Sequence, residues 1–196
     1  MKNIIRILTT FFDDGQGTLY LYINRSLTPG NGAIAKIYVS TCPFDLVTCN
    51  TPPQAWGAAI PVDALNSPYR NTRTAIRPRD GLEVILSTGR PGSLGSEDLW
   101  VSTRATTQDE NWFPPVPINC NWLVPMPCPD WAPAGALVNS PAFDGGPALS
   151  WDGTELYFFS QRTDLPGFAG GRDLYVSTRK KLCDSTKNTS CIASSQ

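Results

Sequence analysis

The chain has 196 residues, enough for one domain with a sizeable core, and its formal net charge is −1. It contains 18 prolines, 16 glycines and no histidine. The lack of histidine excludes Ser-His-Asp triads, Cys-His dyads and histidine-ligated metal sites within this chain. The sequence has neither a basic stripe nor a long apolar span. We therefore expect no nucleic-acid partner and no insertion into a membrane.

The many turn residues, together with the lack of a sustained helical period, predict an all-β protein built of short strands. The expected strands are 1–12, 18–24, 35–41 and 56–62, then 73–76, 83–87, 98–103 and 112–118, and finally 147–150, 155–160 and 173–178. The strand at 112–118 contains three prolines, which restricts it to the edge of a sheet.

Two long segments of the sequence repeat each other. Residues 80–104 read DGLEVILSTGRPGSLGSEDLWVSTR, and residues 152–179 read DGTELYFFSQRTDLPGFAGGRDLYVSTR. A fainter third copy runs from Thr18 through Arg25 to Thr41. Repetition of units that contain strands predicts an array in which each unit buries its faces against its neighbours.

The best-preserved copy resembles a known repeat family. Its strings Ser150-Trp151-Asp152-Gly153, Leu156-Tyr157-Phe158 and Gly171-Arg172-Asp173-Leu174-Tyr175-Val176 are similar to the WD-like β-propeller repeat of bacterial exported proteins and TolB-type propellers. The resemblance covers about residues 13–179 and implies blades that are four-stranded antiparallel sheets. In the first unit Lys36 replaces the aspartate of the Asp-Leu-Tyr string. Three units are fewer than a closed propeller usually has, so the resemblance implies a partial propeller.

We interpret residues 1–196 as a single propeller-like domain with units at 13–65, 66–138 and 139–182 and a tail at 183–196. After Arg179 no pattern for an outer strand follows, so the third unit is expected to lack its last strand. Chain termini in propellers often complete one blade jointly. Residues 3–8 are therefore predicted to supply the missing strand of the third unit.

Six cysteines form three close pairs, predicted to be the disulfides Cys42–Cys49, Cys120–Cys128 and Cys183–Cys191. Free thiols and a four-thiolate zinc site are the alternatives, although zinc knuckles usually have shorter spacings. Disulfides imply an oxidising compartment, so we expect an exported protein, periplasmic or secreted. Residues 1–12 do not match a signal peptide, because Arg6 interrupts a short apolar run.

Four residues recur at matching places and are candidates for ligand binding. Arg90 and Arg162 lie at matching loop starts, and Asp98 and Asp173 precede matching strands. We interpret them as a recurrent salt bridge or loop brace within each blade, with a polar ring for an anionic or sugar ligand as the alternative.

Trp122 and Trp131 are further candidates, for exposed aromatic contacts. They lie in the insertion at 119–135, which the other units lack, and loops on rigid scaffolds often carry binding residues.

The carboxylates Asp80 and Asp152 match a glycosidase pair in residue type. Their identical place in the repeat favours Asp-Gly hairpin turns instead. The acids without a repeat counterpart are Asp45, Asp63, Asp109, Glu110, Asp130 and Asp164, all predicted to lie in loops.

We therefore expect a non-enzymatic propeller module without a metal or cofactor. Such a module would display loops to a protein or glycan partner, and would associate with missing blades or with itself. The alternatives are a fragment of a five-bladed propeller glycoside hydrolase that uses carboxylates, and a structural repeat piece with no activity of its own.

Overall fold

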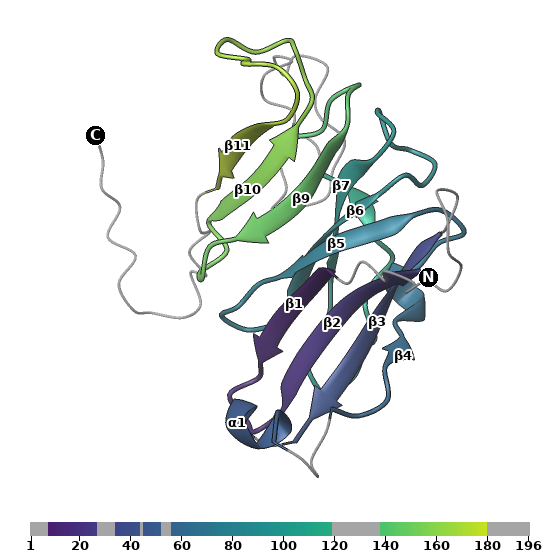
Figure 1. Cartoon of the computed structure of the whole chain (residues 1–196), viewed down its shortest axis with the longest axis vertical. Helices are drawn as coiled ribbons and strands as arrows, with labels where there is room; N and C mark the ends of the chain where they lie inside the picture. The colour runs from purple at the N-terminus through teal and green to yellow at the C-terminus, as the bar shows by residue number, and fades with distance from the viewer. Residues whose placement is uncertain (1–7, 27–33, 44, 52–55, 119–137, 180–196) are drawn as a thin grey trace, which may run out of the picture.

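The computed structural model describes residues 8–26, 34–43, 45–51, 56–118 and 138–179. These residues form three antiparallel sheets that follow one another along the chain, with almost no helix (Figure 1). This architecture confirms the prediction of an all-β fold of antiparallel sheets, and it is consistent with part of a propeller.

The first sheet has the order β1-β2-β3-β4, and the second has the order β5-β6-β7-β8. The strands of the first sheet are β1 (Leu8–Asp13), β2 (Leu19–Ser26), β3 (Ala35–Cys42) and β4 (Ile60–Pro61). Those of the second are β5 (Asn71–Ile76), β6 (Glu83–Thr88), β7 (Asp98–Thr103) and β8 (Val116–Pro117). The third sheet, of order β11-β10-β9, consists of β9 (Asp144–Leu149), β10 (Glu155–Ser160) and β11 (Asp173–Thr178). A short helix α1 (Leu46–Cys49) lies between β3 and β4 within the first sheet, and a 3-10 turn η1 (Asp63–Leu65) lies in the connection from the first sheet to the second.

The outer strands are much shorter than predicted. The segments predicted as strands at 56–62 and 112–118 pair with their sheets only at Ile60–Pro61 and Val116–Pro117. Proline has no N–H to donate to a ladder, and both outer strands contain one. Outside these short ladders the outer segments keep only scattered backbone bonds to the neighbouring strand, such as the Gly57 N–H to the Thr41 carbonyl and the Phe113 N–H to the Thr103 carbonyl.

The prediction that the N-terminal strand completes the third sheet is wrong where the structure describes that strand. Leu8 pairs with Asn24, and β1 continues antiparallel along β2 as far as Asp13. The strand therefore completes the first sheet, which begins before the predicted unit boundary at residue 13. Residues 3–7 of the predicted donor lie outside the described part of the chain.

Two apolar layers lie between the three sheets. The first layer lies between the first and second sheets and includes Tyr22, Val39, Val84, Leu86 and Trp100. The second lies between the second and third sheets and includes Ile85, Leu99, Val101, Leu156 and Phe158. Neighbouring residues of a strand point to opposite faces, so β6 supplies both layers and is buried along its whole length. Burial on both faces explains its continuous apolar run, Val-Ile-Leu.

The innermost strands of the sheets lie together. In Figure 1, β5 lies between β1 and β9, and both neighbours contact it. The Thr10 hydroxyl donates a hydrogen bond to the Thr74 carbonyl, which joins β1 to β5. The Gly146 N–H in turn donates to Ser87 Oγ at 3.1 Å, which joins β9 to β6.

An asparagine at the start of each new unit clamps the preceding sheet. Asn139 is fully buried, and its Oδ1 accepts the Leu99 N–H at 2.8 Å. Its Nδ2 donates to the carbonyls of Leu99 at 2.9 Å and Ile118 at 2.6 Å. Asn66 makes the same two bonds to the backbone of Ile37, at 2.8 Å and 2.9 Å. The repeated Asn-Ser-Pro motif therefore joins successive sheets.

We expect Asn139→Ala to lower the free energy of unfolding by about 3 kcal/mol, because it leaves a buried N–H and a buried carbonyl without partners. Urea denaturation measures this loss. The matched control is Asn111→Ala, which removes an exposed side chain bonded only to the neighbouring Asp109 and should change stability by less than about 0.5 kcal/mol. Equal losses in the two variants would contradict the clamp.

Candidate functional site

The predicted residue Arg162 is directed into the protein. Its guanidinium donates to Ser160 Oγ at 3.1 Å and to the Val138 carbonyl at 2.6 Å. It also lies 3.5 Å from Asp144 Oδ1 and 5.4 Å from the centroid of the Tyr175 ring. Arg162 therefore ties the segment that enters the third unit, at Val138, to the strands of the third sheet.

Arg90 makes the equivalent contacts in the second sheet. It donates to Thr88 Oγ1 at 3.3 Å, to the Leu65 carbonyl at 2.7 Å and to Asn71 Oδ1 at 3.0 Å. Its guanidinium lies 5.2 Å from the Trp100 ring centroid, and burial lowers its pKa. The matching contacts agree with the interpretation of this arginine pair as a recurrent brace.

Asp98 and Asp173 hold the loop that precedes their strands. Asp98 is fully buried and accepts the backbone N–H groups of Leu94 and Gly95. Asp173 accepts the Ala169 N–H at 3.0 Å. Both aspartates are loop braces, and the carboxylate that faces Arg162 belongs to Asp144 rather than to Asp173.

The predicted disulfide Cys42–Cys49 is present, with a Cα–Cα distance of 6.1 Å. It connects the end of β3 to α1 and packs with Leu19 and Trp56. The predicted pairs Cys120–Cys128 and Cys183–Cys191 and the candidates Trp122 and Trp131 lie outside the described residues.

The carboxylates considered for catalysis have structural partners. Asp80 and Asp152 lie in hairpin turns, as predicted, and accept the N–H groups of Leu82 and Thr154 at 3.1 Å. Glu110 accepts hydrogen bonds from Tyr22 of the first sheet and from Arg104 of the second. The described residues contain no group of three or more acids and cysteines that could hold a metal ion.

The feature that breaks the repeat is on the inner strand β5. The pairing of β5 with β6 shifts between Thr72 and Thr74, and the intervening Arg73 has a φ of 42°. The corresponding bulge in β9 is occupied by Gly146, with a φ of 64°. A left-handed backbone favours glycine, because a Cβ there approaches the following carbonyl. Arginine at this position is the kind of local strain that often accompanies function.

Arg73 reaches across to the third sheet and forms an arginine–phenylalanine cluster there. Its guanidinium lies 4.8 Å from the ring centroid of Phe159, and that of Arg172 lies 5.0 Å from the same centroid. Arg172 also lies 5.0 Å from the centroid of Phe143, whose ring stacks on Phe159 with a centroid distance of 5.5 Å. The cluster consists of Arg73, Arg172, Phe143 and Phe159.

The cluster is electropositive. Burial lowers the pKa of Arg73, and the nearby charges of Arg172 and Arg70 lower it further, while Glu97 opposes them. Glu97 already lies 3.1 Å from the largely exposed Arg70 and accepts the Thr72 hydroxyl. Two guanidinium groups over one stacked aromatic pair offer fork-shaped donors to a carboxylate, sulfate or phosphate group.

None of the residues in this cluster was among the sequence candidates. A signal was available, because aligning Asn71-Thr72-Arg73 with Asp144-Gly145-Gly146 places an arginine opposite a glycine. This difference between arginine and glycine becomes informative only when the structure shows that both residues occupy the same β-bulge.

Comparisons with protein-family models, with characterised proteins and with solved structures find no match for this chain. Among the described residues, no helix has the length and apolar character needed to cross a bilayer.

The first prediction from this region concerns Asp98, whose pKa is raised to about 6, chiefly by burial. An acid whose pKa is higher in the folded state binds its proton more tightly there. Its contribution to stability is therefore present below pH 4 and is lost as pH rises to roughly 6. Compared with Asp98→Asn, the unmodified protein should lose about 2 kcal/mol of unfolding free energy across this range. If the unfolding free energies of the two proteins, measured by urea denaturation, changed with pH in parallel, the raised pKa of Asp98 would be contradicted.

The second prediction tests the strained backbone at Arg73. Arg73→Gly and Arg73→Ala both remove the guanidinium, but only glycine fits the left-handed conformation without cost. We expect the glycine variant to be more stable than the alanine variant by about 1 kcal/mol in thermal or urea unfolding. At Thr103, an exposed strand position, the order should reverse, because glycine weakens strands. Equal stabilities at residue 73 would show that its backbone is not strained.

Proposed function

We propose that this chain is a non-enzymatic binding module, part of a β-propeller, that recognises an anionic group on a protein or glycan partner. The observation that carries the proposal is the arginine–phenylalanine cluster. It lies where the inner strands β5 and β9 meet, and its Arg73 occupies the bulge position that is Gly146 in the third sheet.

The chemistry of the cluster supports an anionic ligand. Arginine binds carboxylate and sulfate groups through parallel N–H donors, and a stacked aromatic pair offers a flat apolar surface to a sugar ring or an acidic side chain. The Phe143 and Phe159 rings also hold the two guanidinium groups in place by cation–π contact. A preorganised site loses less entropy on binding.

A non-catalytic role is supported by the partners of the acids. Asp80 and Asp152 are used in turns, and Glu110 is used between two sheets. Glycoside hydrolysis needs two carboxylates that are available on either side of one bond, whereas each of these three already has a structural partner. Export is part of the proposal, since the Cys42–Cys49 disulfide fits an oxidising compartment.

The test is calorimetric titration with three probes: a sulfated heparin oligosaccharide, a polyglutamate peptide and neutral dextran. We expect binding of an anionic probe that weakens as salt rises, because salt screens charge. The double variant Arg73→Gly with Arg172→Ala should bind about tenfold more weakly, equivalent to the loss of about 1.4 kcal/mol. Heparin binding without polyglutamate binding would assign a glycan partner, and the reverse result a protein partner.

The matched control is Arg79→Ala, which removes an exposed arginine in the Asp80–Gly81 turn and should leave binding unchanged. If Arg79→Ala weakened probe binding as much as the double variant, the loss would be explained by the net charge of the protein and not by the cluster. Tighter binding of dextran than of either anionic probe would contradict an anion site.

A further inference from the structure

The third sheet has an open face whose counterpart in the second sheet is fully covered. On the second sheet, Ile85, Leu99 and Val101 are 0%, 0% and 2% exposed, because the third sheet packs on them. The strand registers place Tyr157, Leu174 and Val176 at the same positions of the third sheet. These three residues are 38%, 74% and 55% exposed.

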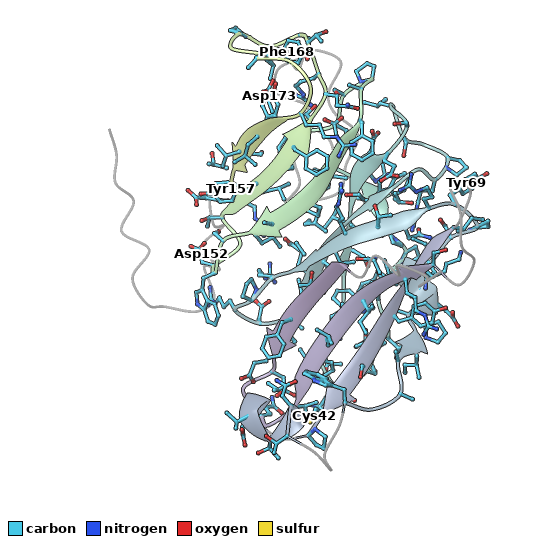
Figure 2. All side chains as sticks on the ribbon, in the orientation of Figure 1. Cys42, Tyr69, Asp152, Tyr157, Phe168 and Asp173 are labelled. Carbon is cyan, nitrogen blue, oxygen red and sulfur yellow. A yellow bond between two sulfur atoms is a disulfide. The ribbon has the colours of Figure 1, made fainter. Side chains whose placement is uncertain are left out.

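Figure 2 shows Tyr157 on β10 at the side of the third sheet that faces away from the other sheets. The opposite side of the same sheet carries Leu156 and Phe158, which are buried against the second sheet. The sheet is therefore apolar on both faces although the described residues cover only one. An apolar face on a soluble protein indicates an interaction surface.

Glu155, a charged residue at the rim of this face, indicates which kind of partner can dock there. In the second sheet, Glu83 begins β6 and accepts two hydrogen bonds from Arg179 of the third sheet, at 2.8 Å and 3.0 Å. Arg179 thereby links the two sheets across their interface. Glu155 begins β10 and holds the same position as Glu83. Its side chain is half-buried and accepts the neighbouring Tyr157 hydroxyl at 2.7 Å.

We propose that the open face, made of Tyr157, Leu174 and Val176 with Glu155 at its rim, docks a further antiparallel sheet of this same repeat. The docking sheet brings an apolar face to the three apolar residues and a strand-end arginine to Glu155. This arrangement continues the interface that the second and third sheets already form. It is independent of the anion site, since none of these residues belongs to the arginine–phenylalanine cluster.

The first sheet of a second copy does not supply the required arginine. In the second and third sheets the arginine follows the Ser-Thr pair that ends the third strand of the sheet, as Arg104 and Arg179. In the first sheet the same position is Cys42, which is buried and bonded to Cys49. Charge complementarity therefore favours a sheet of the arginine-bearing type over this chain's own first sheet.

The experiment compares the chain with a lengthened chain in which a copy of residues 105–179 is inserted directly after Arg179. The junction is natural, because Arg179 and Arg104 occupy equivalent positions. The inserted segment includes β9, β10 and β11, the sheet that packs against the second sheet. Hydrogen–deuterium exchange of the β10 and β11 amides is the main measurement, with sedimentation velocity to report the oligomeric state.

We expect β10 and β11 to exchange at least about tenfold more slowly in the lengthened monomer than in the original chain. In the lengthened chain, Leu174→Asp should abolish this protection, and Glu155→Gln should reduce it. Both substitutions should have little effect on exchange in the original chain. The matched control is Leu94→Asp, at a residue that is 53% exposed in the loop between β6 and β7, and it should preserve the protection.

Three results would overturn the proposal. Unchanged exchange of β10 and β11 in a lengthened chain whose inserted strands are themselves protected would show that the face does not accept a repeat sheet. Protection of β11 equal to that of β7 in the original monomer would show that the face is already covered. A dimer of the original chain that Leu174→Asp dissociates would identify a second copy as the occupant.

Discussion

The buried arginine at the end of the third strand is the interaction on which the packing of the sheets depends. Arg104 is fully buried, and it donates to the Gly81 carbonyl at 2.8 Å and to Glu110 at 3.1 Å. Glu110 also accepts the Tyr22 hydroxyl of the first sheet at 2.9 Å. A buried guanidinium without partners would cost several kcal/mol. The second sheet is therefore held in the position at which Arg104 reaches both the Gly81 carbonyl and Glu110.

The same arginine explains why the Asp-Gly turn recurs with so little change. Arg179 donates to the Gly153 carbonyl at 2.6 Å, just as Arg104 does to Gly81. A Cβ on Gly153 would lie 2.6 Å from the Arg77 side chain, and a Cβ on Gly81 would lie 2.2 Å from the Phe12 ring. Both glycines also have a positive φ. The glycine therefore allows the turn to form and lets the neighbouring sheet approach it.

The sequence alone was sufficient for the features that depend on local pattern or repetition. The strand alternation, the Asp-Gly turns and the Cys42–Cys49 bridge could all be predicted, because each depends on residues close in the chain. The partner of β1 could not be predicted, because a short apolar strand is compatible with either end of the array. The cluster at Arg73 was missed for a related reason, since Phe159 and Arg172 approach it only when two sheets are packed together.

A repeat array separates structural from functional residues by symmetry. The same contacts recur in successive units at Asn66 and Asn139, and again at Arg90 and Arg162. Their repeated geometry is explained by packing. Arg73 departs from that symmetry at a backbone position suited to glycine, and it brings its charge close to that of Arg172 on the same Phe159 ring. Leu174 departs in the opposite way, because its residue type follows the repeat while its burial does not. We propose a ligand for the first departure and a docked sheet for the second, and the two are physically separate requirements.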